Sequence, residues 1–189
     1  SKITAIAVSH GHFDHTGGLA HFIKAAPSAK IYMHPQAPAP KFSFKDGKAS
    51  DVGMPEELRE ILSRNPGRVV EAAGPTQVAE GIFVTGEVPR SGGFEDTGGR
   101  FFQDSAQKKP DLLPDDQSLF FEGKDGIVVL LGCAHAGVVN TVRHIWKTVG
   151  RKNIDALIGG MHLVNASKER MEKTVIFLKG LNARLLAPC

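Results

Sequence analysis

Residues 9–19 read SHGHFDHTGGL, and this stretch directs the interpretation of the rest of the chain. Three of the eight histidines fall, with an aspartate, within the six positions from His10 to His15. Alternate side chains of an extended segment face the same way, so His10 and His12 are expected to point into one place. The following turn would direct Asp14 and His15 into an adjacent place. Imidazoles and a carboxylate are good ligands for zinc, manganese or iron, so this cluster predicts a metal site.

Four ligands drawn from six consecutive residues cannot all wrap comfortably around one ion. Two neighbouring divalent ions that share the loop fit the cluster better. The competing interpretation is a solvated turn with surface histidines. That interpretation leaves unexplained why the histidines and a glycine pair directly follow a run as apolar as ITAIAV.

Two further histidines stand where an apolar strand is expected to end. His135 lies in VVLLGCAHAG, and His162 lies in DALIGGMHL. Because ligands often converge at such an edge, both are candidate metal ligands or their neighbours. His21 and His144 fall on expected helices and are assigned to the surface or to packing. His34, before a proline at another strand end, could line the site.

The chain mixes strands and helices, with a region rich in hairpins in the middle. Residues 35–54 are expected to form a loop. Strands are expected at 3–8, 30–34, 69–72, 77–79, 82–85, 118–122, 127–131, 156–158 and 185–187. Helices are expected at 19–26, from Pro55 onward, at 138–149 and after an N-cap at Ser167.

Residues 87–114 form a long segment without a regular pattern. Such a segment is either a surface excursion that packs its own phenylalanines or a lid over a pocket, and the sequence leaves both open. Within it, Arg90 and Lys109 could bind an anionic group.

Composition narrows the class of protein. The chain has 189 residues, a formal net charge of +3 and scattered basic residues, which argues against nucleic acid as a partner. No apolar run approaches the roughly 18 residues of a membrane span. Cys133 and Cys189 do not form a disulfide framework, so a reducing, cytoplasmic location is expected. The expected partner is a small-molecule substrate, anionic or aromatic.

The motif HGHFDH resembles the HxHxDH signature of the metallo-β-lactamase superfamily. This resemblance implies an α/β (α+β) chain folded as an αβ/βα sandwich, with a metal site at one edge of the sheets. Members are mostly hydrolases. DDQSLFF, GCAHAGVVNTV and GGMHL together resemble the branch that contains the archaeal dihydropterin synthase of methanopterin biosynthesis and many bacterial metal-dependent hydrolases.

Carried over from the family, one ion would be held by three histidines, His10, His12 and His135. A second ion would be held by Asp14, His15 and His162. The resemblance also implies that Asp14 handles a proton. Two divalent ions, zinc by preference and otherwise manganese or iron, are therefore the expected cofactors.

The chain departs from the family pattern at the ligand that bridges the ions. Many members carry an aspartate after a strand, where this chain reads LLGCAH. Cys133 could take that place, or Asp115 or Asp116 could supply a carboxylate instead. A buried cysteine is more often a small apolar residue, and that interpretation of Cys133 is slightly favoured.

The ends depart from the pattern too. The chain opens directly into an apolar run and finishes on ARLLAPC, whereas relatives of this type extend further at both ends. A single domain over residues 1–189, an internal fragment incomplete at both ends, is therefore expected. Exposed strand edges could pair with another chain and give a homo-oligomer.

These observations predict a metal-dependent hydrolase that uses a metal-activated water. The first alternative is a dihydropterin-linked synthase of the methanopterin type. A truncated metal-binding module without turnover is a further alternative, and a nuclease is disfavoured by the absence of a basic stripe.

Overall fold

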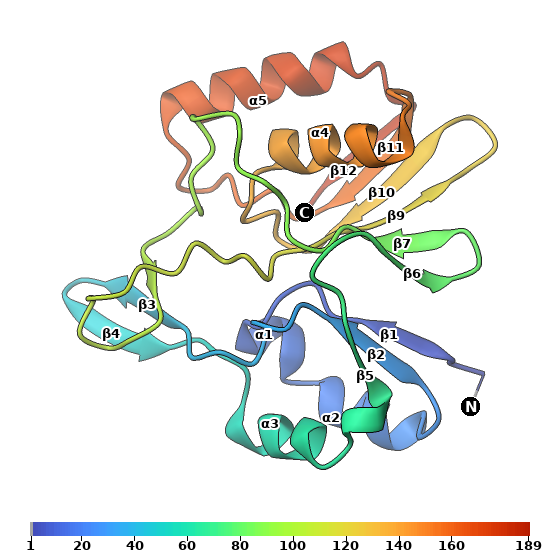
Figure 1. The fold of residues 1–189 in the computed structure, drawn as a ribbon. Helices are drawn as coiled ribbons and strands as arrows, with labels where there is room; N and C mark the ends of the chain where they lie inside the picture. The colour runs from blue at the N-terminus through green and yellow to red at the C-terminus, as the bar shows by residue number, and fades with distance from the viewer. Residues whose placement is uncertain (1) are drawn as a thin grey trace.

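The structure, a computed structural model, describes residues 2–189 and has four layers (Figure 1). Two main sheets face each other in the middle. Three helices cover one side: α1 (Phe13–Thr16), α2 (Leu19–Ala25) and α3 (Glu56–Ser63). Two helices cover the other side: α4 (Val138–Val149) and α5 (Lys168–Gly180). This order of layers is the αβ/βα sandwich that the family resemblance implied.

The smaller main sheet is parallel and has the order β1-β2-β5, with β1 at Ala5–Ala7, β2 at Lys30–Met33 and β5 at Val69–Glu71. Parallel neighbours need crossover connections, and α2 and then α3 with the 3₁₀ turn η1 (Pro66–Arg68) supply them. The buried side chains beneath this sheet include Ile31, Leu19 and Leu58. Packing against this core fixes the end of β1, from which the histidine motif begins.

The larger sheet has six strands in the order β12-β11-β10-β9-β7-β6. Their bounds are β6 Thr76–Ala79, β7 Ile82–Val84, β9 Leu119–Glu122, β10 Ile127–Leu131, β11 Ile154–Gly159 and β12 Leu185–Pro188. β10, β11 and β12 run parallel, while β9, β7 and β6 continue as antiparallel neighbours. The sequence predicted all six strands, and β10 ends just before Cys133 and His135.

The predicted positions of helices α4 and α5 are confirmed. Apolar residues of α4 at helical spacing, Val138, Val142 and Ile145, are buried against the larger sheet. The α5 helix begins after Ser167, whose side-chain oxygen accepts a hydrogen bond from the Arg170 backbone N–H.

The loop predicted at residues 35–54 is wrong over its second half. A hairpin lies there, formed by β3 (Phe42–Lys45) and β4 (Lys48–Asp51), and β8 (Phe101–Phe102) adds a third strand. Asp46 and Gly47 join β3 to β4 with φ values of 53° and 76°. Two consecutive positive φ values are the requirement of a tight hairpin turn, and Asp-Gly is a sequence that meets it.

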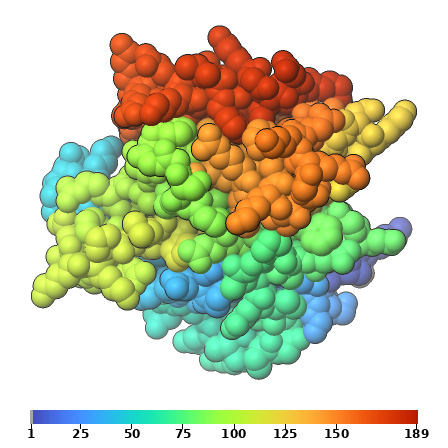
Figure 2. Space-filling model, turned by 45° about the horizontal axis from the view of Figure 1, so that its top comes forward, coloured from blue at the N-terminus to red at the C-terminus, as the bar shows by residue number. Residues whose placement is uncertain are grey.

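Residues 87–114 lie at the surface between this hairpin and α4, as the yellow-green band in Figure 2 shows. Through β8 the segment pairs with β3, so it is anchored rather than loose. Within residues 2–189, no helix combines the length and apolar character needed to cross a membrane.

Candidate metal centre

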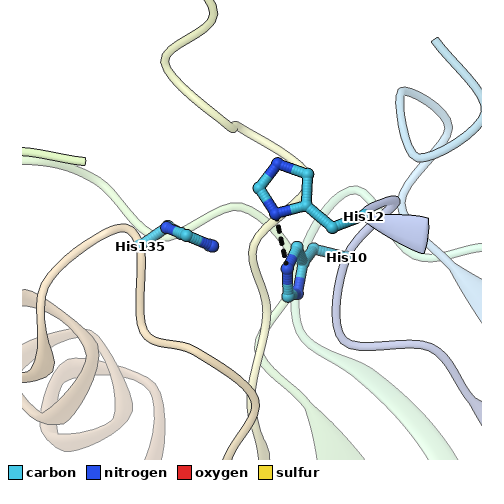
Figure 3. A group of neighbouring side chains, drawn as sticks. All are labelled: His10, His12 and His135. Carbon is cyan, nitrogen blue, oxygen red and sulfur yellow. Dashed lines mark hydrogen bonds between the residues drawn. The ribbon is translucent and has the colours of Figure 1, made fainter. Parts of the chain in front are cut away.

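Three histidine side chains converge at the edge shared by the two sheets (Figure 3). His10 and His12 come from the loop after β1, and His135 comes from the loop between β10 and α4. The three residues are 0%, 6% and 1% exposed, and a nitrogen from each lies within 4.8 Å of the others. The structure therefore assembles, from distant parts of the chain, the first ligand set that the family resemblance implied.

The ring nitrogens of this group suit a divalent cation. His10 Nε2 and His12 Nδ1 are 3.1 Å apart, close to the roughly 3.3 Å between two nitrogens bound to one tetrahedral zinc. His135 Nδ1 lies 2.8 Å from the Thr97 carbonyl oxygen and donates to it, which leaves the Nε2 lone pair free. That Nε2 is buried without a hydrogen-bond partner, as is His12 Nε2.

All three imidazoles are neutral in the folded chain. Burial, followed by the neighbouring histidines, lowers the pKa of His12 to about 3 and lowers that of His10 further. Burial also lowers the pKa of His135 to about 4. Neutral imidazole is the form that binds a metal, so this group is ready to bind at ordinary pH.

A buried ion-pair network holds the loop between His10 and His12. The Gly11 backbone N–H donates to Asp115 Oδ2 over 2.7 Å. Lys41 Nζ donates to Asp115 Oδ1 over 2.7 Å and to Asp111 Oδ2 over 3.1 Å, and all three charged residues are buried. At Gly11 itself, a Cβ would lie only 1.9 Å from the Ala37 carbonyl oxygen, so this close approach requires glycine.

The loop that carries His135 is held from the other side. Glu95 accepts hydrogen bonds from the Val139 and Asn140 backbone N–H groups at the start of α4. Arg90 was a candidate for anion binding, but its Nη2 donates to the carbonyl oxygens of Leu112 and His135. Arg90 therefore holds the His135 loop in place, because its Nη2 is bonded to backbone carbonyl oxygens.

A second group of ligand atoms lies beside the first and shares His10 with it. Nitrogens of His10 and His15 and the sulfur of Cys133 all lie within 4.8 Å of one another. His15 Nε2 is 3.2 Å from Cys133 Sγ. Ser9 Oγ lies 3.2 Å from Nδ1 of both His10 and His15. Without a metal, burial raises the pKa of the Cys133 thiol to about 11, so this sulfur is protonated.

The other predicted ligands lie nearby but outside both groups. Asp14 Oδ2 is 3.6 Å from His15 Nε2, and its side chain is largely exposed. The His162 ring centroid is 4.4 Å from that of His135, and burial lowers the His162 pKa. The assignment of Asp14, His15 and His162 to one second ion stays a prediction. His34 is buried, and its Nδ1 accepts from the Gln36 backbone N–H.

The two aspartates considered for the bridging position are engaged elsewhere. Asp115 binds Lys41 and Gly11, as described above. Asp116 Oδ2 accepts the Ala136 N–H over 2.9 Å, while its Oδ1 is buried without a partner. Burial raises the Asp116 pKa to about 6. Neither carboxylate belongs to a group of three clustered ligand atoms among residues 2–189.

An aromatic ring and a cavity border the centre. The Phe101 ring centroid lies 4.9 Å from that of His12 and 5.3 Å from that of His135. Segment 87–114 therefore contacts the histidines directly, although its role as a lid stays a prediction. A separate cavity of about 570 Å³, mostly apolar, includes Asp14 and His15 among its lining residues.

Sequence reasoning missed several residues that arrange the site, among them Ser9, Lys41, Glu95 and Thr97. Ser9 directly precedes the motif and could have been found by its position. Lys41 carried no signal, since a buried lysine cannot be distinguished from a surface lysine in a sequence. Thr97 acts through its backbone carbonyl, which any residue at that position would offer.

The fold and the histidine geometry agree with the family comparison. Residues 1–188 match the family profile described as the metallo-beta-lactamase superfamily. The chain belongs to this superfamily. Its structure is also similar to the crystal structure of a metal-dependent hydrolase of the β-lactamase superfamily, with a TM-score of 0.78 and 27% identity. That match covers 97% of this chain and 66% of the other.

Two curated relatives come from Methanocaldococcus jannaschii. One is a 7,8-dihydropterin-6-methyl-4-(beta-D-ribofuranosyl)-aminobenzene-5'-phosphate synthase, 30% identical over 188 residues, covering 97% of this chain and 64% of the relative. The other is an uncharacterised protein, 30% identical over 180 residues, covering 92% of this chain and 63% of the relative. The chain thus spans just under two thirds of the length of the curated relatives it matches.

Proposed function

We propose that the chain is a metal-dependent hydrolase that acts on a small-molecule substrate. The observation that carries this proposal is the convergence of His10, His12 and His135, together with the buried Nε2 atoms of His12 and His135, which have no protein partner. Buried polar nitrogens without partners destabilise a fold, so their retention fits a site that binds a cation. The match to a metal-dependent hydrolase of the superfamily supports the same conclusion.

His10, His12 and His135 would hold the first ion, zinc by preference, with His15 and Asp14 placed to contribute to a second. A divalent ion supplies Lewis acidity and makes water a nucleophile near neutral pH. Asp14 is the proposed proton acceptor, because its exposed carboxylate lies beside His15 and lines the cavity. Phe101 would exclude water from one side of the histidines and contact an apolar or aromatic part of the substrate.

The test is the variant His12→Ala, compared with His21→Ala, which replaces an exposed histidine on α2. We expect wild type and His21→Ala to bind metal and to cleave at least one substrate in a panel of esters, thioesters and phosphodiesters. His12→Ala should lose metal and turnover together. Full turnover by His12→Ala would refute the assignment. Stoichiometric metal with no turnover on any substrate would support a metal-binding module instead.

A dihydropterin-linked synthase is the second candidate, favoured by the 30% identity to the M. jannaschii synthase. In this reaction the aminobenzene would displace a leaving group from the dihydropterin, which departs as the new bond forms, and Phe101 would stack against the flat pterin ring. Incubation with a dihydropterin that carries a leaving group and with a ribosylaminobenzene phosphate separates the two functions. Formation of the coupled product would establish the synthase, and its absence alongside cleavage of a panel substrate would establish the hydrolase.

The free thiols of Cys133 and Cys189 fit a reducing compartment, so a cytoplasmic location is part of this proposal.

A further inference from the structure

We propose that Cys133 is a metal ligand, whose thiolate binds with His15, beside the three-histidine group, in place of the family's bridging carboxylate. This inference rests on the proposed function, because it requires that the centre binds metal. It assigns the position that the sequence left open among Cys133, Asp115 and Asp116. It also reverses the interpretation of Cys133 as a small apolar residue.

The sulfur of Cys133 lies where a metal ligand would be needed. Cys133 Sγ lies 3.2 Å from His15 Nε2, and both atoms lie within 4.8 Å of a His10 nitrogen. The alternative carboxylates have other partners, since Asp115 holds Lys41 and Gly11, and Asp116 accepts from Ala136. Cys133 is therefore the residue that completes a second set of ligands at this place.

Close backbone packing on both sides of Gly132 places the Cys133 sulfur at this position. A Cβ at Gly132 would lie 2.5 Å from Ser9 Cβ, so the chain before Cys133 contacts the loop before His10 with no room for a side chain. On its other side, a Cβ at Gly160 would lie 2.4 Å from the Gly132 carbonyl oxygen. The ends of β10 and β11 and the loop after β1 thus meet at the residue that precedes Cys133.

The imidazoles of His10 and His15 both contact Ser9 through Nδ1. A serine oxygen has two lone pairs, and Ser9 Oγ can accept from Nδ1–H of both His10 and His15, each 3.2 Å away. That arrangement leaves the lone pair of each ring on Nε2, which faces His12 Nδ1 in His10 and the Cys133 sulfur in His15. The adjoining group, which shares His10, contains the buried and unpartnered His135 Nε2, an independent sign of a cation at this edge.

A thiolate at this position has a chemical consequence. Sulfur ligands favour zinc over the hard ions manganese and magnesium, which prefer oxygen. The second position should therefore select zinc, or cobalt as its spectroscopic substitute. Binding replaces the thiol proton with the metal and releases that proton to solvent.

The experiment is cobalt substitution of the wild type, of Cys133→Ser and of Cys189→Ser. Cys189 is the matched control, because it is the chain's other cysteine and is exposed near the end of β12. We expect a near-ultraviolet sulfur-to-cobalt charge-transfer band in the wild type and in Cys189→Ser. The band should be absent from Cys133→Ser, whose metal content should fall by one ion per chain.

A second measurement on the wild type does not depend on whether a variant folds. With zinc bound, alkylation followed by mass spectrometry should label Cys189 and spare Cys133, and a chelator should expose both. The assignment of Cys133 as a thiolate ligand would be overturned if cobalt binds without a charge-transfer band. It would also be overturned if both cysteines are labelled equally with zinc bound. Either result would leave the histidine site intact. A wild type that binds no metal would overturn the proposed function as well.

Discussion

The two groups of ligand atoms share His10 but are built differently. His10, His12 and His135 are buried, and the loops that carry them are fixed by the Asp115–Gly11 and Thr97–His135 contacts. In the other group, His15 is exposed and Cys133 is half-buried, and their polar atoms contact each other and Ser9. The first group is organised by the core of the fold, whereas the second depends on a few side-chain contacts at the surface.

This difference matters because a metal site needs rigid support to keep its ligands in place. Contacts behind metal-ligating histidines are worth about 10–100-fold in metal affinity. The buried group has such contacts on both of its loops, so its affinity should be the higher of the two.

Lys41→Met should break the support of the buried group. It leaves the buried carboxylates of Asp111 and Asp115 without their cation, and removing one partner of a buried ion pair destabilises by about 3–5 kcal/mol. Urea unfolding would measure this loss. The control is Arg64→Met, which removes the exposed partner of Glu60 and should change stability by at most about 0.5 kcal/mol.

Metal titration of Lys41→Met tests whether the buried network also supports the three-histidine site. If Asp115 positions Gly11, the three-histidine site should lose affinity even under conditions where Lys41→Met is folded. Equal stability losses in Lys41→Met and Arg64→Met would show that the buried network does not support the loop.

The metal-free protein should lose stability as the pH falls below about 6.5. Burial lowers the pKa values of His10, His12 and His135, so the unfolded chain binds more protons in this range and stability rises with pH. His34 and His162 act in the same direction. Asp116 opposes them, because its raised pKa makes the folded chain take up a proton near pH 6.

Five histidines act against two carboxyl groups, Asp116 and Glu95, whose pKa values burial raises, so the net sign is a loss. Denaturant unfolding in the presence of a chelator should show a decrease on the order of 3 kcal/mol between pH 7 and pH 5. His12→Gln should flatten this dependence, because it removes one of the buried imidazoles, whereas His21→Gln serves as the exposed control. A stability that is constant, or that increases toward pH 5, would contradict the buried neutral histidines.

The sequence predicted the main sheets and helices well because their patterns reflect burial. The α4 helix has the bounds expected from its apolar spacing, and the strands before His135 and His162 end where expected. The hairpin of β3 and β4 was missed because the side chains of β4 are all exposed, so no alternation of buried and exposed residues marks it. Its only signal was the Asp46-Gly47 turn.

At the site, the motif identified the residue types that come together, but not which of them form each group of ligand atoms. His162 carried the same strand-end signal as His135, yet only His135 joins a group of clustered ligand atoms. At His162 the backbone has a φ of 46°, a conformation that alternating strand patterns do not reveal. Cys133 looked like a small apolar residue because the sequence could not show that Gly132 packs against Ser9.

Ser9→Ala is the smallest change and distinguishes the two groups most directly. Losing one side-chain hydrogen-bonding group should lower the free energy of unfolding by about 0.5–1.5 kcal/mol. His10 remains enclosed by His12 and His135 without Ser9, whereas His15 is exposed and loses its Nδ1 partner. The affinity for the ion at the His15–Cys133 group should therefore fall by about tenfold, while the ion at the three-histidine group binds nearly as before.

Competition titrations with a chromophoric chelator would resolve the two binding steps in Ser9→Ala. Ser63→Ala is the control, since it removes a hydroxyl that bonds only a helix carbonyl far from the motif in sequence. In cobalt, the weakened step should be the one that carries the sulfur charge-transfer band, because Ser9 supports His15 and His15 lies beside Cys133. If both steps weaken equally, the two groups act as one site, and their different burial does not translate into different affinity.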